Sequence, residues 1–101
     1  MRLKALIIED EAPAYRRLHG LLSAHHPQLE VVDVVDTIQA AMTWFGENTS
    51  PDVIFSDIQL SDGLSFEIYK QVPPPCPIIF TTAYDEYMLE AFRTNGIDYL
   101  L

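Results

Sequence analysis

The sequence predicts a doubly wound α/β domain, in which helices cover both faces of a parallel sheet. Apolar runs of strand length alternate with segments of helical periodicity along the whole chain. Each return to a parallel neighbour needs a right-handed crossover, and a helix commonly forms it. The length of 101 residues, 49% of them hydrophobic, suffices for one core but not for two ordinary domains. We therefore expect one domain over residues 1–101.

The first half of the chain contains two strand–helix units. Residues 3–10 (LKALIIED) have a continuous apolar centre and predict the first strand, and Pro13 marks the start of the helix that follows. Residues 29–36 (LEVVDVVD) predict the second strand. Asp36 or Thr37 can then cap the second helix, because both side chains carry an oxygen that accepts a backbone N–H bond.

The third strand has an unusual end. The run from Val53 to Phe55 is β-branched and aromatic, as in a buried strand, yet it finishes on Ser56 and the carboxylate of Asp57. After a Ser-Asp-Gly turn, Ser65 can cap a short third helix.

Three further segments complete the alternation. Residues 77–82 (PIIFTT) predict the fourth strand. Residues 85–96 (DEYMLEAFRTNG) predict a helix with acids in its first turn and Asn-Gly at its end. Residues 97–101 (IDYLL) begin a fifth strand, and we expect the helix that would follow it to be missing from this chain.

Ligands of such sheets bind beyond the carboxyl ends of the strands, where the strand order reverses. In the flavodoxin-like order 2-1-3-4-5 this point lies between the first and third strands. The first strand ends at Glu9, Asp10 and Glu11, and the third ends at Asp57. At least three carboxylates should therefore converge, and one of them must take up a proton unless a cation lies between them.

Mg²⁺ suits such a site, since it binds one or two carboxylates and keeps several of its waters. Glu9, Asp10 and Asp57 can supply side-chain oxygens or hold the waters, and the backbone carbonyl of Gln59 lies just beyond. Taken alone, the acids from Glu9 onward also suit the start of a helix, where the dipole favours negative charge.

A metal beside an exposed aspartate allows phosphoryl transfer to Asp57. The end of the fourth strand adds the hydroxyl of Thr82 as a donor to the phosphoryl oxygens, and the small side chain of Ala83 leaves the pocket open. Taken alone, Thr82 would be an ordinary β-branched strand residue. Tyr99, in the expected fifth strand, would likewise be an ordinary core aromatic.

Composition excludes several classes of protein. Fifteen acidic and six basic residues leave a net charge of -9, which repels a phosphate backbone, so this segment should not contact nucleic acid directly. The apolar run near the amino terminus reaches acids by Glu9 and is too short for a signal peptide or a membrane span. Cys76 is the single cysteine and cannot form an internal disulfide, which fits a cytoplasmic setting.

Four sequence blocks resemble, in order and spacing, those of bacterial response-regulator receiver domains in two-component systems: IIEDE, PDVIFSDIQLSDG, PIIFTTAYDEYMLEAF and NGIDYLL. The run TAYDEYMLEAF with DYLL resembles receivers of the LytTR type. Position by position, the resemblance implies that Glu9 and Asp10 form the acidic pair of a Mg²⁺ pocket and that Asp57 is the phosphoacceptor. It also implies that the backbone carbonyl of Gln59 ligates the metal.

The resemblance further implies a switch. Thr82 matches the hydroxyl that follows the phosphoryl group, Ala83 its small neighbour, and Tyr99 the aromatic that turns inward on activation. A sensor histidine kinase donates the phosphoryl group in this family, and the domain is no enzyme beyond catalysing its own acceptance and hydrolysis. The resemblance also implies homodimerisation through the face formed by the helix at 85–96 and the strand at 97–101.

The family pattern continues past DYLL into a lysine and a proline. We therefore expect the phosphate-binding lysine, the last helix and a LytTR-type DNA-binding output domain to lie outside this chain, as in a piece of a longer regulator. Two other functions are open: a pseudo-receiver that acts as an interaction module without phosphate, and a phosphohydrolase with an aspartate nucleophile. The hydrolase needs a second aspartate where Gln59 stands.

Overall fold

The computed structural model describes residues 2–73, 76–81 and 97–100, and for 97–100 the backbone only. At its centre lies a five-stranded parallel sheet with the order β2-β1-β3-β6-β7. The strands are β1 (Leu3–Ile8), β2 (Leu29–Val35), β3 (Val53–Asp57), β6 (Ile78–Thr81) and β7 (Ile97–Leu100). Counted along the chain, this is the predicted order 2-1-3-4-5, so the flavodoxin-like, doubly wound topology is confirmed.

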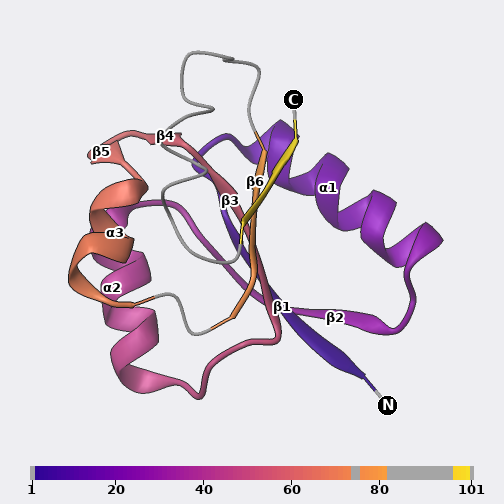
Figure 1. Cartoon of the computed structure of the whole chain (residues 1–101). Helices are drawn as coiled ribbons and strands as arrows, with labels where there is room; N and C mark the ends of the chain where they lie inside the picture. Colours follow the sequence, from indigo (N-terminus) through magenta and orange to yellow (C-terminus); the bar gives the residue numbers. More distant parts are fainter. Residues whose placement is uncertain (1, 74–75, 82–96, 101) are drawn as a thin grey trace.

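Helices lie on both faces of the sheet (Figure 1). Helix α1 (Ala12–His25) lies on one side, and α2 (Ile38–Glu47) and α3 (Phe66–Gln71) lie together on the other. Pro13 occupies the first turn of α1, where its missing N–H leaves no bond unmade. The helix predicted over residues 85–96 lies outside the described residues.

The structure decides between the two candidate caps of α2. Thr37 is the N-cap residue, and its hydroxyl accepts a hydrogen bond from the N–H of Ala40 at 2.9 Å. The prediction for Ser65 is half right: Ser65 precedes α3, but its side chain makes no capping bond. Its hydroxyl instead donates to the backbone carbonyl of Asp57 at 2.6 Å.

The sequence did not predict the short antiparallel hairpin of β4 (Gln59–Leu60) and β5 (Gly63–Leu64) directly after β3. It predicted only a turn there. Strands of two residues are too short for an alternating pattern, so they leave no periodic signal.

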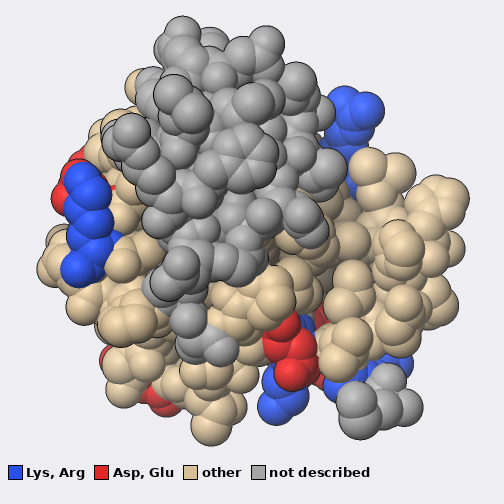
Figure 2. Space-filling view, viewed as in Figure 1, with Lys and Arg blue, Asp and Glu red and all other residues tan. Residues whose placement is uncertain are grey.

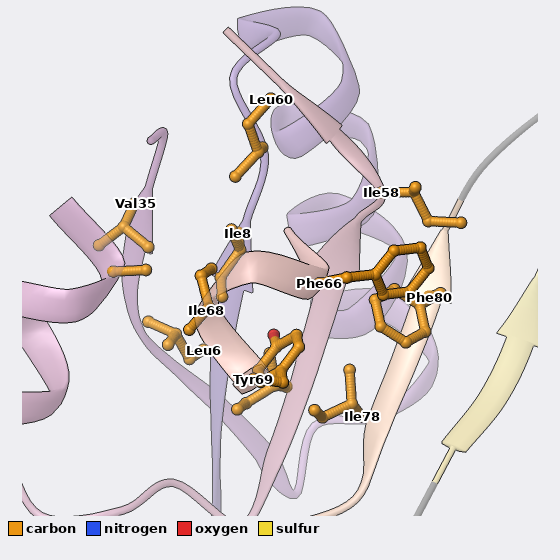
Figure 3. Close-up of a cluster of buried hydrophobic side chains, with 12 residues drawn as sticks. Leu6, Ile8, Val35, Ile58, Leu60, Phe66, Ile68, Tyr69, Ile78 and Phe80 are labelled. Atoms are coloured by element: carbon orange, nitrogen blue, oxygen red, sulfur yellow. The ribbon is translucent and has the colours of Figure 1, made fainter. Parts of the chain in front are cut away.

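The core has two layers, one on each face of the sheet. Successive residues of β1 point to opposite faces, and the four from Ala5 to Ile8 are all buried, as expected for a central parallel strand covered on both sides. The larger layer, under α2 and α3, is drawn in Figure 3. There the ring of Phe80 packs edge-on against Phe66, with centroids 5.1 Å apart, and against Tyr69 at 6.1 Å.

Gly63 gives a direct stability prediction. Its φ of +139° is one that L side chains rarely adopt, and an added Cβ would lie 3.1 Å from Cδ1 of Ile38. We expect Gly63→Ala to lower the free energy of unfolding by about 1–3 kcal/mol in urea denaturation. Gly20→Ala is the matched control, because Gly20 lies in α1 with nothing within 4 Å of the added atom. It should raise stability by about 0.5–1 kcal/mol. Equal changes in the free energy of unfolding for Gly63→Ala and Gly20→Ala would contradict the backbone strain assigned to position 63.

Candidate metal centre

Three carboxylates meet at the carboxyl ends of β1 and β3. Ile8 and Ser56 are opposite each other in the two paired strands, so the residues that follow them, Glu9 and Asp57, lie side by side. Asp10 comes next along the chain. One oxygen from each of the three side chains lies within 4.8 Å of the others. Because β1 and β3 are adjacent parallel strands that lead to helices on opposite faces of the sheet, the topology itself produces this convergence.

Backbone N–H groups orient these carboxylates. Oε2 of Glu9 accepts from the N–H of Asp10 at 3.0 Å and of Glu11 at 3.3 Å. Oδ1 of Asp57 accepts from the N–H of Ile58 at 2.8 Å. These bonds hold the side chains in place although they carry like charges.

Burial and mutual repulsion oppose ionisation of the cluster. Burial raises the pKa of Glu9 to about 8, and the negative charge of Asp57 contributes next. Burial also raises the pKa of Asp57, against the lowering effect of a hydrogen bond from Glu9. Because burial raises the pKa of Glu9 to about 8, the Glu9–Asp57 pair retains one proton near neutral pH when no cation is bound. A divalent cation would replace that proton, and carboxylate oxygens are the donors that Mg²⁺ prefers.

This shared proton predicts how stability depends on pH. Glu9 ionises at 4.5 in the unfolded chain and near 8 when folded, so between these values only the folded state keeps the proton. Without divalent ions, the free energy of unfolding should therefore fall as pH rises through this window. Mg²⁺ should stabilise the protein most at the alkaline end and should release a proton on binding, measurable by calorimetry in buffers of different ionisation enthalpy. Glu9→Gln should remove most of the fall, and an unchanged pH profile in that variant would contradict the assignment.

The remaining predicted site residues are placed less completely. Gln59 is an exposed residue of β4, two positions after Asp57. Thr82 and Ala83 lie outside the described residues, although Thr81 before them is opposite Asp57 in the β3–β6 pair. Tyr99 lies in β7 opposite Phe80 of β6, and only its backbone is described.

Sequence reasoning missed two serines that hold the Asp57 peptide. The hydroxyl of Ser65 donates to the Asp57 carbonyl at 2.6 Å, and that of Ser56 donates to the same oxygen at 3.0 Å. Both serines are fully buried. A serine at a strand end or before a helix suits many roles, so nothing in the sequence alone identifies this contact.

Charged side chains elsewhere are dispersed. Figure 2 shows Lys and Arg at separate places on the visible face. Lys70 pairs with Glu67 at 3.3 Å. Among the described residues on this face, no group of basic side chains forms a patch. Among all residues that the structure describes, no helix has the length and apolar character needed to span a bilayer.

Comparison with known proteins identifies the family. Residues 5–101 match the response regulator receiver domain family. The chain belongs to this family. The receiver is 39% identical over 102 residues to the sensory transduction protein LytT of Bacillus anthracis, a match that covers 98% of the chain and 41% of LytT. It is 37% identical over 100 residues to an uncharacterised response regulatory protein of Vibrio cholerae, with 96% of the chain and 38% of that protein covered.

Solved structures agree with the receiver fold. The response regulatory domain of protein mrkE from Klebsiella pneumoniae superposes with a TM-score of 0.83 at 34% identity, covering 98% of this chain and 82% of that one. A two-component response regulator from Clostridium difficile gives 0.82 at 28% identity, covering 99% and 83%. The predicted family, its LytT-like relatives and the signalling role of a two-component receiver are thus confirmed. The chain spans 41% of the length of the LytT protein.

Proposed function

We propose that this receiver takes a phosphoryl group on the carboxylate of Asp57, with Mg²⁺ held by Glu9, Asp10, Asp57 and the backbone carbonyl of Gln59. The observation that carries the proposal is the meeting of three carboxylate oxygens within 4.8 Å at the ends of two adjacent strands. Such a cluster is unfavourable in the folded state unless a cation or a proton compensates it. In a receiver domain, a divalent cation at this place serves phosphoryl transfer to the neighbouring aspartate.

The chemistry assigned to Asp57 is an in-line displacement. One carboxylate oxygen forms the bond to phosphorus as the bond from phosphorus to the donor breaks, and the donor keeps the electron pair. The N–H of Ile58 holds Oδ1 at 2.8 Å, which fixes the plane of the carboxylate. When bound, Mg²⁺ would neutralise charge on the transferring oxygens and favour the ionised form of Asp57.

The donor and the output are proposed from the family. Receivers act with sensor histidine kinases, so a phosphohistidine is the expected donor, and the domain would catalyse only its own phosphorylation and dephosphorylation. In the longer regulator, a LytTR-type DNA-binding domain would provide the output, as the LytT relatives suggest. The roles of Thr82, Ala83 and Tyr99, the dimer face and the cytoplasmic setting stay predictions.

Incubation with Mg²⁺ and acetyl phosphate tests the proposal. Intact mass should increase by one phosphoryl group, and peptide mapping should place that group on Asp57. Omission of Mg²⁺, or its removal by EDTA, should prevent the change, because no cation then neutralises the carboxylate cluster or the transferring oxygens. If neither acetyl phosphate nor a beryllofluoride mimic modifies or binds the chain, the interaction-module interpretation replaces this one.

A further inference from the structure

The loop from Asp57 to Ser65 is tied at its base to the acceptor residue. Ser65 donates its hydroxyl to the carbonyl of Asp57 at 2.6 Å and its N–H to the carbonyl of Ile58 at 2.7 Å. Between these anchors, Gln59 and Leu60 of β4 pair with β5. The loop is therefore a closed hairpin whose first residue is the proposed phosphoacceptor.

The tip of this hairpin is tied to a different element. Oδ1 of Asp62 accepts from the N–H of Ile38 at 2.9 Å, and Oδ2 is 3.3 Å from the N–H of Gln39. These are the first two N–H groups of α2, and Thr37 satisfies the third, that of Ala40. A side chain that is 24 positions away from Ile38 thus completes the cap of the helix.

Apolar contacts support the same junction. The Cα of Gly63 approaches Ile38 so closely that an added Cβ would lie 3.1 Å from the Cδ1 atom of Ile38. On the other strand of the hairpin, Leu60 is 4% exposed and belongs to the core beneath α2 and α3. The junction therefore combines a charged cap with tight packing, and its geometry depends on both elements.

From these contacts we infer that Asp62 is a positioning residue for the metal-binding loop. We call the pair of bonds from Asp62 to Ile38 and Gln39 the Asp62 clasp. With the base fastened by Ser65 and the tip by the clasp, the peptide of Gln59 between them is fixed relative to Asp57. The inference rests on the proposed function, because it concerns how the carbonyl of Gln59 meets a metal ion at Asp57.

The charge of the clasp has its own effect. A carboxylate at a helix amino terminus is favoured by the helix dipole and by the unpaired N–H groups there. The bonds of Asp62 are solvent-exposed helix caps, and loss of such a cap removes only a part of the stability of a folded domain. Loss of the clasp should thus affect the position of the loop more than the folding of the domain.

Mg²⁺ binding to three variants tests the inference. Asp62→Ala should weaken Mg²⁺ binding about tenfold, the lower end of the effect of outer residues that orient metal ligands. Asp62→Asn keeps one acceptor oxygen without the charge and should restore most of that affinity. Asp52→Ala is the matched control, because the Asp52 carboxylate also accepts a distant backbone bond, from Lys4 at 2.7 Å, at the opposite end of β3. It should leave Mg²⁺ affinity within about twofold of wild type.

Amide hydrogen exchange gives a readout that does not depend on metal. In Asp62→Ala, the N–H groups of Ile38 and Gln39 should lose protection, and in Asp52→Ala they should not. Equal Mg²⁺ affinity of Asp62→Ala and wild type would overturn the inference and leave the proposed function intact. So would an Asn variant as weak as the Ala variant, since charge alone would then explain the loss. A wild-type chain that neither binds Mg²⁺ nor accepts a phosphoryl group would overturn both.

Discussion

Asp57→Asn is expected to abolish phosphoryl acceptance entirely. The amide keeps the size of the carboxylate and an oxygen for the 2.8 Å bond from the N–H of Ile58, so the strand end should fold as before. What it loses is the nucleophile, because a neutral amide oxygen does not displace a leaving group from phosphorus under these conditions. Intact mass after incubation with Mg²⁺ and acetyl phosphate should show no addition at any time point.

The same variant makes an opposite prediction about stability. Burial raises the pKa values of both Asp57 and Glu9, and the charge of Asp57 raises that of Glu9 further, so removing the charge of Asp57 relieves Glu9. In the absence of divalent ions, Asp57→Asn should increase the free energy of unfolding, and the pKa of Glu9 should move down toward 4.5. A control with the same charge change, Asp52→Asn, lies at the other end of β3 and should show neither effect.

One result would contradict this assignment, and a second would leave it unsupported. A variant that still gains one phosphoryl group would place the acceptor elsewhere, and peptide mapping would then identify it. A variant that loses both the modification and its folded structure would leave the chemical role unsupported, so circular dichroism must accompany the mass measurement. The metal-free gain in stability separates a missing nucleophile from a damaged fold.

Phe80→Ala is expected to have the largest effect on stability. Phe80 is fully buried in β6, between β3 and β7, and its ring contacts those of Phe66 and Tyr69 from α3 (Figure 3). Truncation of a buried Phe costs about 3–5 kcal/mol, through lost burial and the cavity left behind. Small domains have about 5–15 kcal/mol in total, so the variant should be close to unfolding at ambient temperature.

Urea denaturation measures this loss as a lower midpoint with an unchanged slope. Phe80→Leu fills part of the space and should lose less. Leu21→Ala is a control on the opposite side of the sheet, because Leu21 is 48% exposed in α1, and it should change stability by no more than about 0.5 kcal/mol. A loss below about 1 kcal/mol for Phe80→Ala would show that α3 does not depend on this ring for its place on the sheet.

The Asp57 and Phe80 predictions are linked structurally through the loop that joins β3 to α3. Phe66 of α3 packs on Phe80, and Ser65 just before it bonds to the carbonyl of Asp57. A change in the core beneath α3 can therefore displace the acceptor strand end, even though Phe80 itself has no polar role. The acidic cluster lowers stability when it lacks a cation, because burial opposes the ionised carboxylates.

Much of the fold could be predicted from the sequence because its signals are local. Apolar runs such as residues 5–8 and 53–55, and the helical periods between strands, depend only on neighbouring positions. With the rule that parallel crossovers are right-handed, these signals predict the doubly wound class. The order 2-1-3-4-5, which places Glu9 beside Asp57, is the one that flavodoxin-like sheets have. The three carboxylates of the candidate site could be predicted because they lie at or directly after the ends of strands.

Only the tertiary structure decided the contacts between distant segments. It selected Thr37 as the cap of α2, directed the Ser65 hydroxyl to the Asp57 carbonyl, and brought Asp62 to the first turn of α2. Serine and aspartate can bond to any nearby backbone group, so their partners depend on which segments the fold brings within about 3 Å. The sequence by itself determined that carboxylates would gather at the ends of β1 and β3, because parallel strands carry their carboxyl ends to one edge. The hydrogen bonds of Ser65 and Asp62 that hold the loop after β3 follow only from the tertiary structure.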